Sequence, residues 1–130
     1  MASYPVLTAP KRSAWRWVLA PAAAVAAASH IPVIAPHLDE APYMGVLFIV
    51  LTAACLVLAV AVLIRDTAAV YGLAILTCGL AIIGYIATRS VAFPQLADDV
   101  GNWLEPLGIV AILAEAVVVI AAVNGVSARR

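Results

Sequence analysis

Long apolar runs separated by short polar connectors organise this chain. A helix that spans a bilayer needs roughly 20 mainly apolar residues, and three runs meet that length: 42–64, 67–88 and 104–123. A fourth, alanine-rich run comes first and covers residues 14–31. The pattern predicts an all-α membrane protein, an antiparallel bundle of four transmembrane helices. One transmembrane domain, 14–124, then lies between an N-terminal tail, 1–13, and a C-terminal tail, 125–130.

The first run has a second interpretation. Lys11, Arg12 and Arg16 precede a short apolar core, and the three alanines at 26–28 resemble the small-residue cleavage site of a secretory signal peptide. A retained helix is the alternative, because the apolar run can extend through Ile31 to spanning length. Both interpretations leave the orientation of the other three runs unchanged.

The stretch SHIPVIAPHLDEAP, residues 29–42, joins the first run to the second and holds both histidines of the chain. Proline inside a helix removes a backbone hydrogen bond and clashes with the preceding turn. The prolines are therefore predicted to end one helix near residue 31 and to start the next at Pro42. We expect an external loop that carries His37 and Glu40.

Composition and charge narrow the class of protein. The chain is 66% hydrophobic and 11% charged, whereas an average soluble domain is roughly 45–50% apolar and about 25% charged. The bilayer is the expected partner, with other membrane subunits or a second copy as further candidates. A net charge of zero, without a basic patch among aromatic residues, gives no indication of a nucleic-acid partner.

The basic residues predict the orientation. With four alternating helices, Arg89 lies on one side of the membrane and every other lysine and arginine on the opposite side. Cytoplasmic segments are enriched in these residues, which predicts cytoplasmic termini and a multi-pass protein of the plasma (inner) membrane. The residues on the predicted cytoplasmic side are Lys11, Arg12, Arg16, Arg65, Arg129 and Arg130.

The two external connectors resemble each other. Each contains Pro-x-Leu, an acidic pair, and then a glutamate and a proline that open a helix, in residues 36–45 and 94–108. A duplication would give a parallel 2+2 repeat about an axis along the membrane normal. The alternative is that Pro, Asp and Glu are ordinary residues for a helix start.

Small residues form stripes at helical spacing, which predicts the faces that turn inward. Small side chains let helices approach closely in lipid. The larger aliphatic residues are then expected to face the lipid. The stripes contain Gly45, Thr52, Cys55 and Ala59 on one helix, Ala74, Cys78 and Ala81 on the next, and Gly108, Ala111, Glu115 and Ala122 on the last.

Glu115 is the candidate site within the membrane. It lies about 13–14 Å along its helix from Pro106, near the bilayer centre, where an acid costs roughly 2.5–3.5 kcal/mol. Thr52, Thr77 and Cys78 lie at similar depth and are predicted to hydrogen-bond it. The residue is either part of a proton or cation relay, or a protonated group that holds helices together.

A second candidate site combines the external polar residues. The side chains of His30, His37 and Glu40 could act as ligands to a metal ion, and the two histidines could be the axial ligands of a haem. Their spacing matches no specific metal or haem motif. The alternative is a pair of interfacial histidines that are partly solvated or cap helix ends. Arg89 is predicted to form an ion pair with Glu105 or Glu40 across the connectors.

No catalytic motif with supporting context is present, so the chain is predicted not to be an enzyme. Two functions follow. The first is an accessory or interaction subunit of the plasma membrane. The second is a small binding or transport module in which the external cluster binds a metal, haem or small ligand and Glu115 carries a proton.

Two segments of the sequence also suggest a family. HLDEAPYMGVLF, residues 37–48, and the segment from Tyr85 to Gly108 resemble small four-helix actinobacterial membrane proteins of unassigned function. Ala92-Phe93-Pro94 stands where those proteins more often have Gly-Leu-Pro. The resemblance implies no activity, but it implies that one recurring set of residues belongs together: His30, His37, Glu40, Arg89, Glu105 and Glu115.

Overall fold

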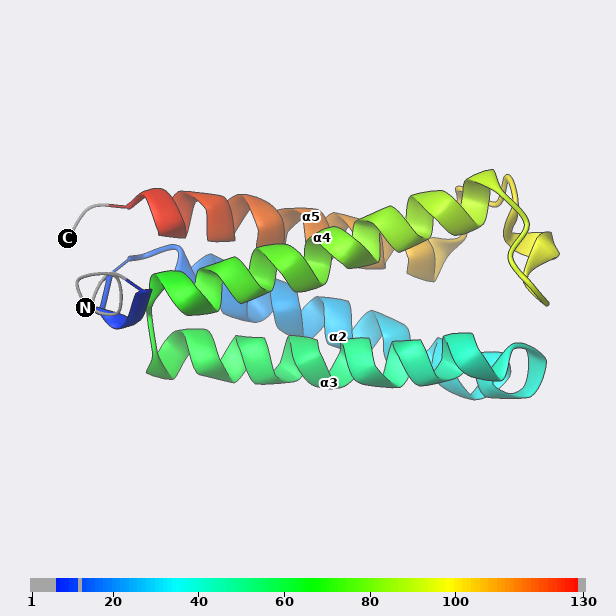
Figure 1. The fold of residues 1–130 in the computed structure, drawn as a ribbon, viewed down its shortest axis with the longest axis horizontal. Helices are drawn as coiled ribbons and strands as arrows, with labels where there is room; N and C mark the ends of the chain where they lie inside the picture. Colours follow the sequence, from blue (N-terminus) through cyan, green and yellow to red (C-terminus); the bar gives the residue numbers. More distant parts are fainter. Residues whose placement is uncertain (1–6, 12, 129–130) are drawn as a thin grey trace.

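The computed structural model describes residues 7–11 and 13–128 of the chain. Within these residues, four helices are long and apolar enough to cross a membrane. They run antiparallel, so that α2 begins and α5 ends at the same end of the bundle (Figure 1). The helices are α2 (Arg16–Glu40), α3 (Pro42–Ile64), α4 (Ala68–Ser90) and α5 (Pro106–Ser127), with a short 3₁₀ turn, η1 (Ala97–Asp99), between α4 and α5.

The helix packing is uneven around the bundle. α2 packs extensively on α3 and on α5, and α4 packs on α5, whereas α3 and α4 share the smallest of these four interfaces. Figure 1 shows α3 and α4 close together at the turn that joins them and diverging toward the other end. We call that other end, which carries residues 91–105, the connector end, and the opposite one the terminal end.

Small residues line the interfaces, as the stripes predicted. Thr52 and Cys55 on α3, Cys78 on α4 and Glu115 on α5 are buried. The core around them contains Ala23, Ala26 and Ala27 of α2, each of them 0% exposed. α2 therefore contributes to the core of the bundle, and its retention in place of a cleaved signal peptide stays a prediction.

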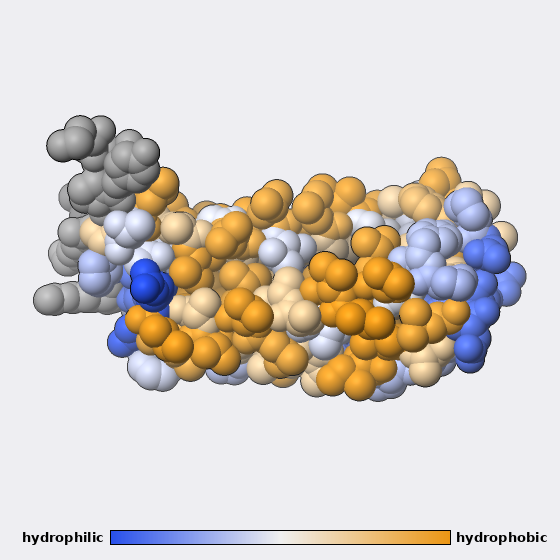
Figure 2. Space-filling model, turned by 60° about the horizontal axis from the view of Figure 1, so that its bottom comes forward, coloured by the Kyte–Doolittle hydropathy of each residue, from blue (hydrophilic) through white to orange (hydrophobic). Residues whose placement is uncertain are grey.

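The large aliphatic side chains face outward over the length of the bundle. Figure 2 shows an apolar surface along the middle and polar residues at the two ends. Leu47, Val50, Leu76 and Leu80 are all more than half exposed. Such a surface is stable only when lipid covers it, so the chain has the structure of a multi-pass membrane protein.

The predicted loop at residues 29–42 is wrong. α2 continues through Pro32 and Pro36 to Glu40, and Ala41 alone separates it from α3. Both prolines are exposed on the surface of the helix, where the missing N–H groups do not disturb packing with neighbours. A helix in lipid tolerates proline because an irregular loop there would leave more backbone groups without hydrogen bonds. His30 and His37 consequently lie on α2.

The two connectors therefore differ in length, although their sequences resemble each other. The first is a single residue, and the second spans residues 91–105. The first turn of α3 nevertheless contacts the second connector, because the hydroxyl of Tyr43 donates a hydrogen bond to the carbonyl of Pro94 at 2.7 Å. The 2+2 repeat remains a prediction.

Asp66 fastens the terminal end of the bundle. Its carboxylate accepts hydrogen bonds from the N–H of Ser13 (2.6 Å) and from the hydroxyl of Tyr71, and Nη1 of Arg16 lies 3.8 Å from it. Its carbonyl accepts from the N–H of Lys11 at 2.6 Å. Asp66 is 5% exposed, so a buried acid joins the segment before α2 to the turn between α3 and α4.

The C-terminal boundary also differs from the prediction. The last apolar run was predicted to end at residue 123, with a tail from 125, but α5 continues past Asn124 and Gly125 to Ser127. A Cβ atom on Gly125 would lie 2.6 Å from the ring of Tyr71, so the glycine allows α5 to approach the residue that binds Asp66. Of the predicted tails, residues 1–6, 12 and 129–130 lie outside the described residues.

Asp66→Asn should destabilise the bundle by about 1–3 kcal/mol, because the variant weakens two charge-assisted hydrogen bonds and leaves buried donors poorly satisfied. The measurement is SDS-induced unfolding of the purified protein followed by tryptophan fluorescence. Asp98→Asn is the control, since Asp98 is exposed in the second connector. Equal stability of the two variants would contradict a structural role for Asp66.

Candidate functional site

A groove of about 690 Å³ occupies the space between α3 and α4 as they diverge. Its floor comes from α2 and α5, including Val33, Leu107 and Ala111. Leu47 on α3 and Leu80 on α4 line it and are more than half exposed, so the groove opens sideways toward the lipid. The walls are mainly apolar, and the polar lining residues gather at the connector end and at one deep position.

Glu115 and His30 form the deep polar position. Nε2 of His30 lies 3.6 Å from Oε2 of Glu115, and the two side chains are 8% and 3% exposed. Nδ1 of His30 lies 2.6 Å from the carbonyl of Ala26. That oxygen can only accept, so Nδ1 carries a proton and Nε2 faces the carboxyl group. Both residues line the groove.

This pairing corrects the sequence prediction for both residues. His30 was placed in the external cluster, and Glu115 was predicted to hydrogen-bond Thr52, Thr77 and Cys78. The continuation of α2 past residue 31 places His30 near the middle of that helix, at the depth of Glu115. One feature of the sequence could have predicted this continuation: Ile31, Val33 and Ile34 extend the apolar run beyond His30.

None of the three residues that were predicted to hydrogen-bond Glu115 does so. The hydroxyl of Thr52 donates to the carbonyl of Phe48 within its own helix, at 2.7 Å. Cys78 is buried in the same apolar core as Cys55. Thr77 lines the groove without a hydrogen bond to Glu115 among the described residues.

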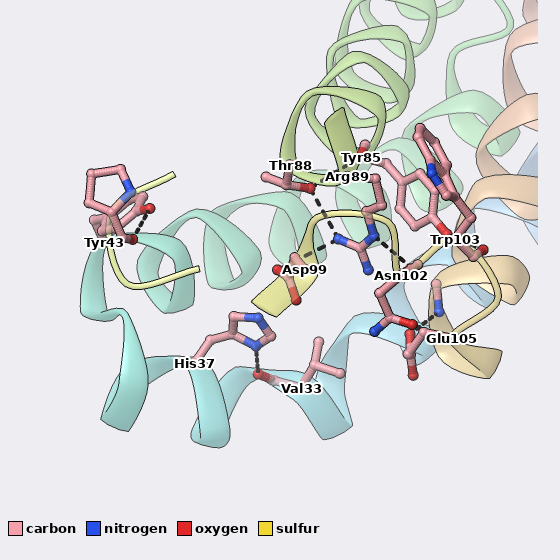
Figure 3. Close-up of polar contacts among 12 residues, drawn as sticks. Val33, His37, Tyr43, Tyr85, Thr88, Arg89, Asp99, Asn102, Trp103 and Glu105 are labelled. Carbon is pink, nitrogen blue, oxygen red and sulfur yellow. Dashed lines mark hydrogen bonds and ion pairs between the residues drawn. The ribbon is translucent and has the colours of Figure 1, made fainter. Parts of the chain in front are cut away.

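Arg89 organises the connector end of the groove (Figure 3). Its Nε donates to the carbonyl of Asn102 at 3.2 Å, and its Nη1 donates to the hydroxyl of Thr88 at 3.0 Å and lies 3.7 Å from the carboxylate of Asp99. The guanidinium also lies over the ring of Tyr85, 4.2 Å from its centroid. One side chain thus joins the end of α4 to the second connector.

The predicted ion pairs of Arg89 with Glu105 or Glu40 are wrong. Glu105 caps α5, because its carboxylate oxygens accept from the N–H groups of Leu107 (3.1 Å) and Gly108 (2.6 Å). Glu40 is exposed at the end of α2. The actual partner, Asp99, was not singled out in the sequence, since η1 rather than any sequence pattern brings its carboxylate back to Arg89.

The external histidines do not form the predicted metal site. Nδ1 of His37 lies 2.7 Å from the carbonyl of Val33, and its ring contacts Phe48 edge-on at 4.8 Å. His30 contacts the same phenylalanine at 5.4 Å but belongs to the deep pair. In residues 7–11 and 13–128, no group of three His, Cys, Asp or Glu side chains could hold a metal ion. A metal ion therefore finds no assembled set of three such ligands there.

Comparison of the chain with family models, curated proteins and solved structures finds no match. The resemblance to small actinobacterial membrane proteins stays a prediction.

Arg89→Gln should loosen the second connector, because it removes a charge that makes hydrogen bonds worth about 1.5–3 kcal/mol. Hydrogen exchange of residues 91–105 is then expected to be about tenfold to a hundredfold faster. Arg65→Gln is the matched control, since Arg65 is exposed at the terminal end. Unchanged exchange in Arg89→Gln would contradict the assigned role.

Proposed function

We propose that the protein is a small binding module of the membrane, and that its groove takes up a lipophilic small molecule sideways from the bilayer. The observation that supports this most strongly is a mainly apolar groove between diverging helices with polar side chains at defined positions. Ligand sites in proteins commonly have volumes of about 300–1,000 Å³ and few, well-placed polar groups.

The length of the groove indicates an elongated ligand or one with an apolar substituent. Glu115 of α5 and Glu105, which caps that helix, both line it and are ten residues apart, which corresponds to about 15 Å. Leu76 and Arg89 on α4 are thirteen residues apart, which corresponds to about 20 Å. A molecule of this length could contact the deep pair and the connector end together.

The orientation that the charges predict supports uptake at the outer side of a plasma membrane. Lys11, Arg16 and Arg65 lie toward the terminal end, whereas Arg89 lies at the connector end. By the enrichment of Lys and Arg in cytoplasmic segments, the terminal end is cytoplasmic. The groove then opens in the outer half of the bilayer.

An accessory-subunit function has less support. Its expected contact surface, the exposed aliphatic residues, is also what lipid alone would cover. The groove, by contrast, is a concave site that lipid contact does not require, and it favours the binding module. Enzyme activity is not part of the proposal.

The groove can be filled without disturbing the fold. Gly84 lines it, and a Cβ atom there would meet nothing within 4 Å. Gly84→Phe should reduce the affinity for Nile red, a neutral lipophilic dye, at least tenfold, because the ring occupies the ligand's space. The measurement is saturable fluorescence of the dye with protein in lipid nanodiscs.

Gly72→Phe is the matched control, since Gly72 lies on the same helix with equally open space around it and outside the groove. It should bind the dye like the unmodified protein. Absence of saturable binding to the unmodified protein, or equal affinity in both variants, would overturn the proposed function.

The orientation has its own test. Ala97→Cys in η1 and Arg65→Cys in the turn before α4 place exposed thiols at opposite ends of the bundle. In intact cells, a membrane-impermeant maleimide should label only Ala97→Cys. The buried Cys55 and Cys78 should remain unlabelled, and labelling of Arg65→Cys alone would reverse the proposed orientation.

A further inference from the structure

The deep carboxyl group is incompletely satisfied. Oε2 of Glu115 is buried and has no hydrogen-bond partner among the described residues. Its distance of 3.6 Å from Nε2 of His30 is too long for a hydrogen bond. A buried polar atom without a partner is costly, and this one lies in the wall of a groove that a ligand can enter.

The charges around the groove favour a positive ligand. Its ionisable lining residues are three carboxylic acids, one arginine, two histidines and one tyrosine. The arginine is already paired with Asp99, which leaves acidic groups in excess. Phe48 adds an aromatic ring between the histidines, and such rings attract cations. A ligand with an anionic group would be repelled by these acidic side chains, and it would add a further buried charge without a partner.

We propose that the ligand is a lipophilic monocation, and that it exchanges in the groove with a single proton held by the His30–Glu115 pair. This inference rests on the proposed function, since it names the class of molecule that the groove binds. The apolar body would contact the leucines of α3 and α4, and the positive centre would lie at Oε2 of Glu115.

The exchange balances in charge and protons. Besides the proton on Nδ1 of His30, which faces the Ala26 carbonyl, the empty pair holds one proton, on Nε2 of His30 or on the carboxyl group. Binding of one cation places a positive charge beside the carboxylate, and that proton leaves to water. The pair has no net charge before binding, and pair plus ligand have none afterwards, so the membrane interior gains no uncompensated charge.

The other groups that face Glu115 are consistent with a single exchangeable proton. Glu115 is the only ionisable side chain in α5. From α2 it meets His30, and the side chains that α3 and α4 bury in the core of the bundle include the thiols of Cys55 and Cys78. No lysine or arginine is among these groups, so no fixed positive charge competes with the ligand there.

The first test measures binding of radiolabelled tetraphenylphosphonium to the protein in nanodiscs. The unmodified protein should bind it saturably, and Glu115→Gln should lower the affinity for the cation at least tenfold, a larger loss than any change in its affinity for Nile red. Gly72→Phe should behave like the unmodified protein. Equal affinity for the cation in Glu115→Gln would overturn the inference.

The second test needs no variant. In weak buffer, each tetraphenylphosphonium bound should release about one proton, and the affinity should rise up to tenfold per pH unit where the pair is protonated, since proton and cation compete. Binding without proton release would overturn the exchange. Saturable Nile red binding without cation binding would remove only this inference, whereas absence of both would remove the proposed function too.

Discussion

A helix in a bilayer must satisfy its backbone hydrogen bonds internally, and this requirement determines the course of α2. Pro32 and Pro36 weaken the helix locally, but an irregular loop at that depth would leave more backbone N–H and C=O groups without hydrogen bonds. The helix therefore continues to Glu40. Its continuity brings His30 to the depth of Glu115 and leaves only Ala41 as a connector.

The unequal connectors explain the shape of the bundle. The turn that holds Asp66 keeps α3 and α4 together at the terminal end, where Tyr71 and Ser13 bind its buried carboxylate. At the other end, Arg89 draws the second connector onto the end of α4. Held together at one end and free to diverge at the other, α3 and α4 enclose the groove with α2 and α5.

The groove joins the two candidate sites that looked separate in the sequence. Arg89, Asp99 and His37 lie at its connector end, and His30 and Glu115 lie at depth. A mainly apolar space with polar groups at both positions suits an amphipathic molecule better than a metal, for which the described residues assemble no ligand set. The site is therefore a groove shared by all four helices.

The sequence by itself determined the membrane class, the number of helices, the bounds of α3 and the faces that turn inward. These follow from hydrophobic length and from the spacing of small residues, both local properties of the chain. It also identified Glu115 as an intramembrane acid. Only the tertiary structure decided the partners: His30 for Glu115, Asp99 for Arg89, and Tyr71 for Asp66. A proline's effect depends on whether water or lipid surrounds the helix, and an ion pair depends on how neighbouring segments fold back, so neither can be read from spacing along one chain.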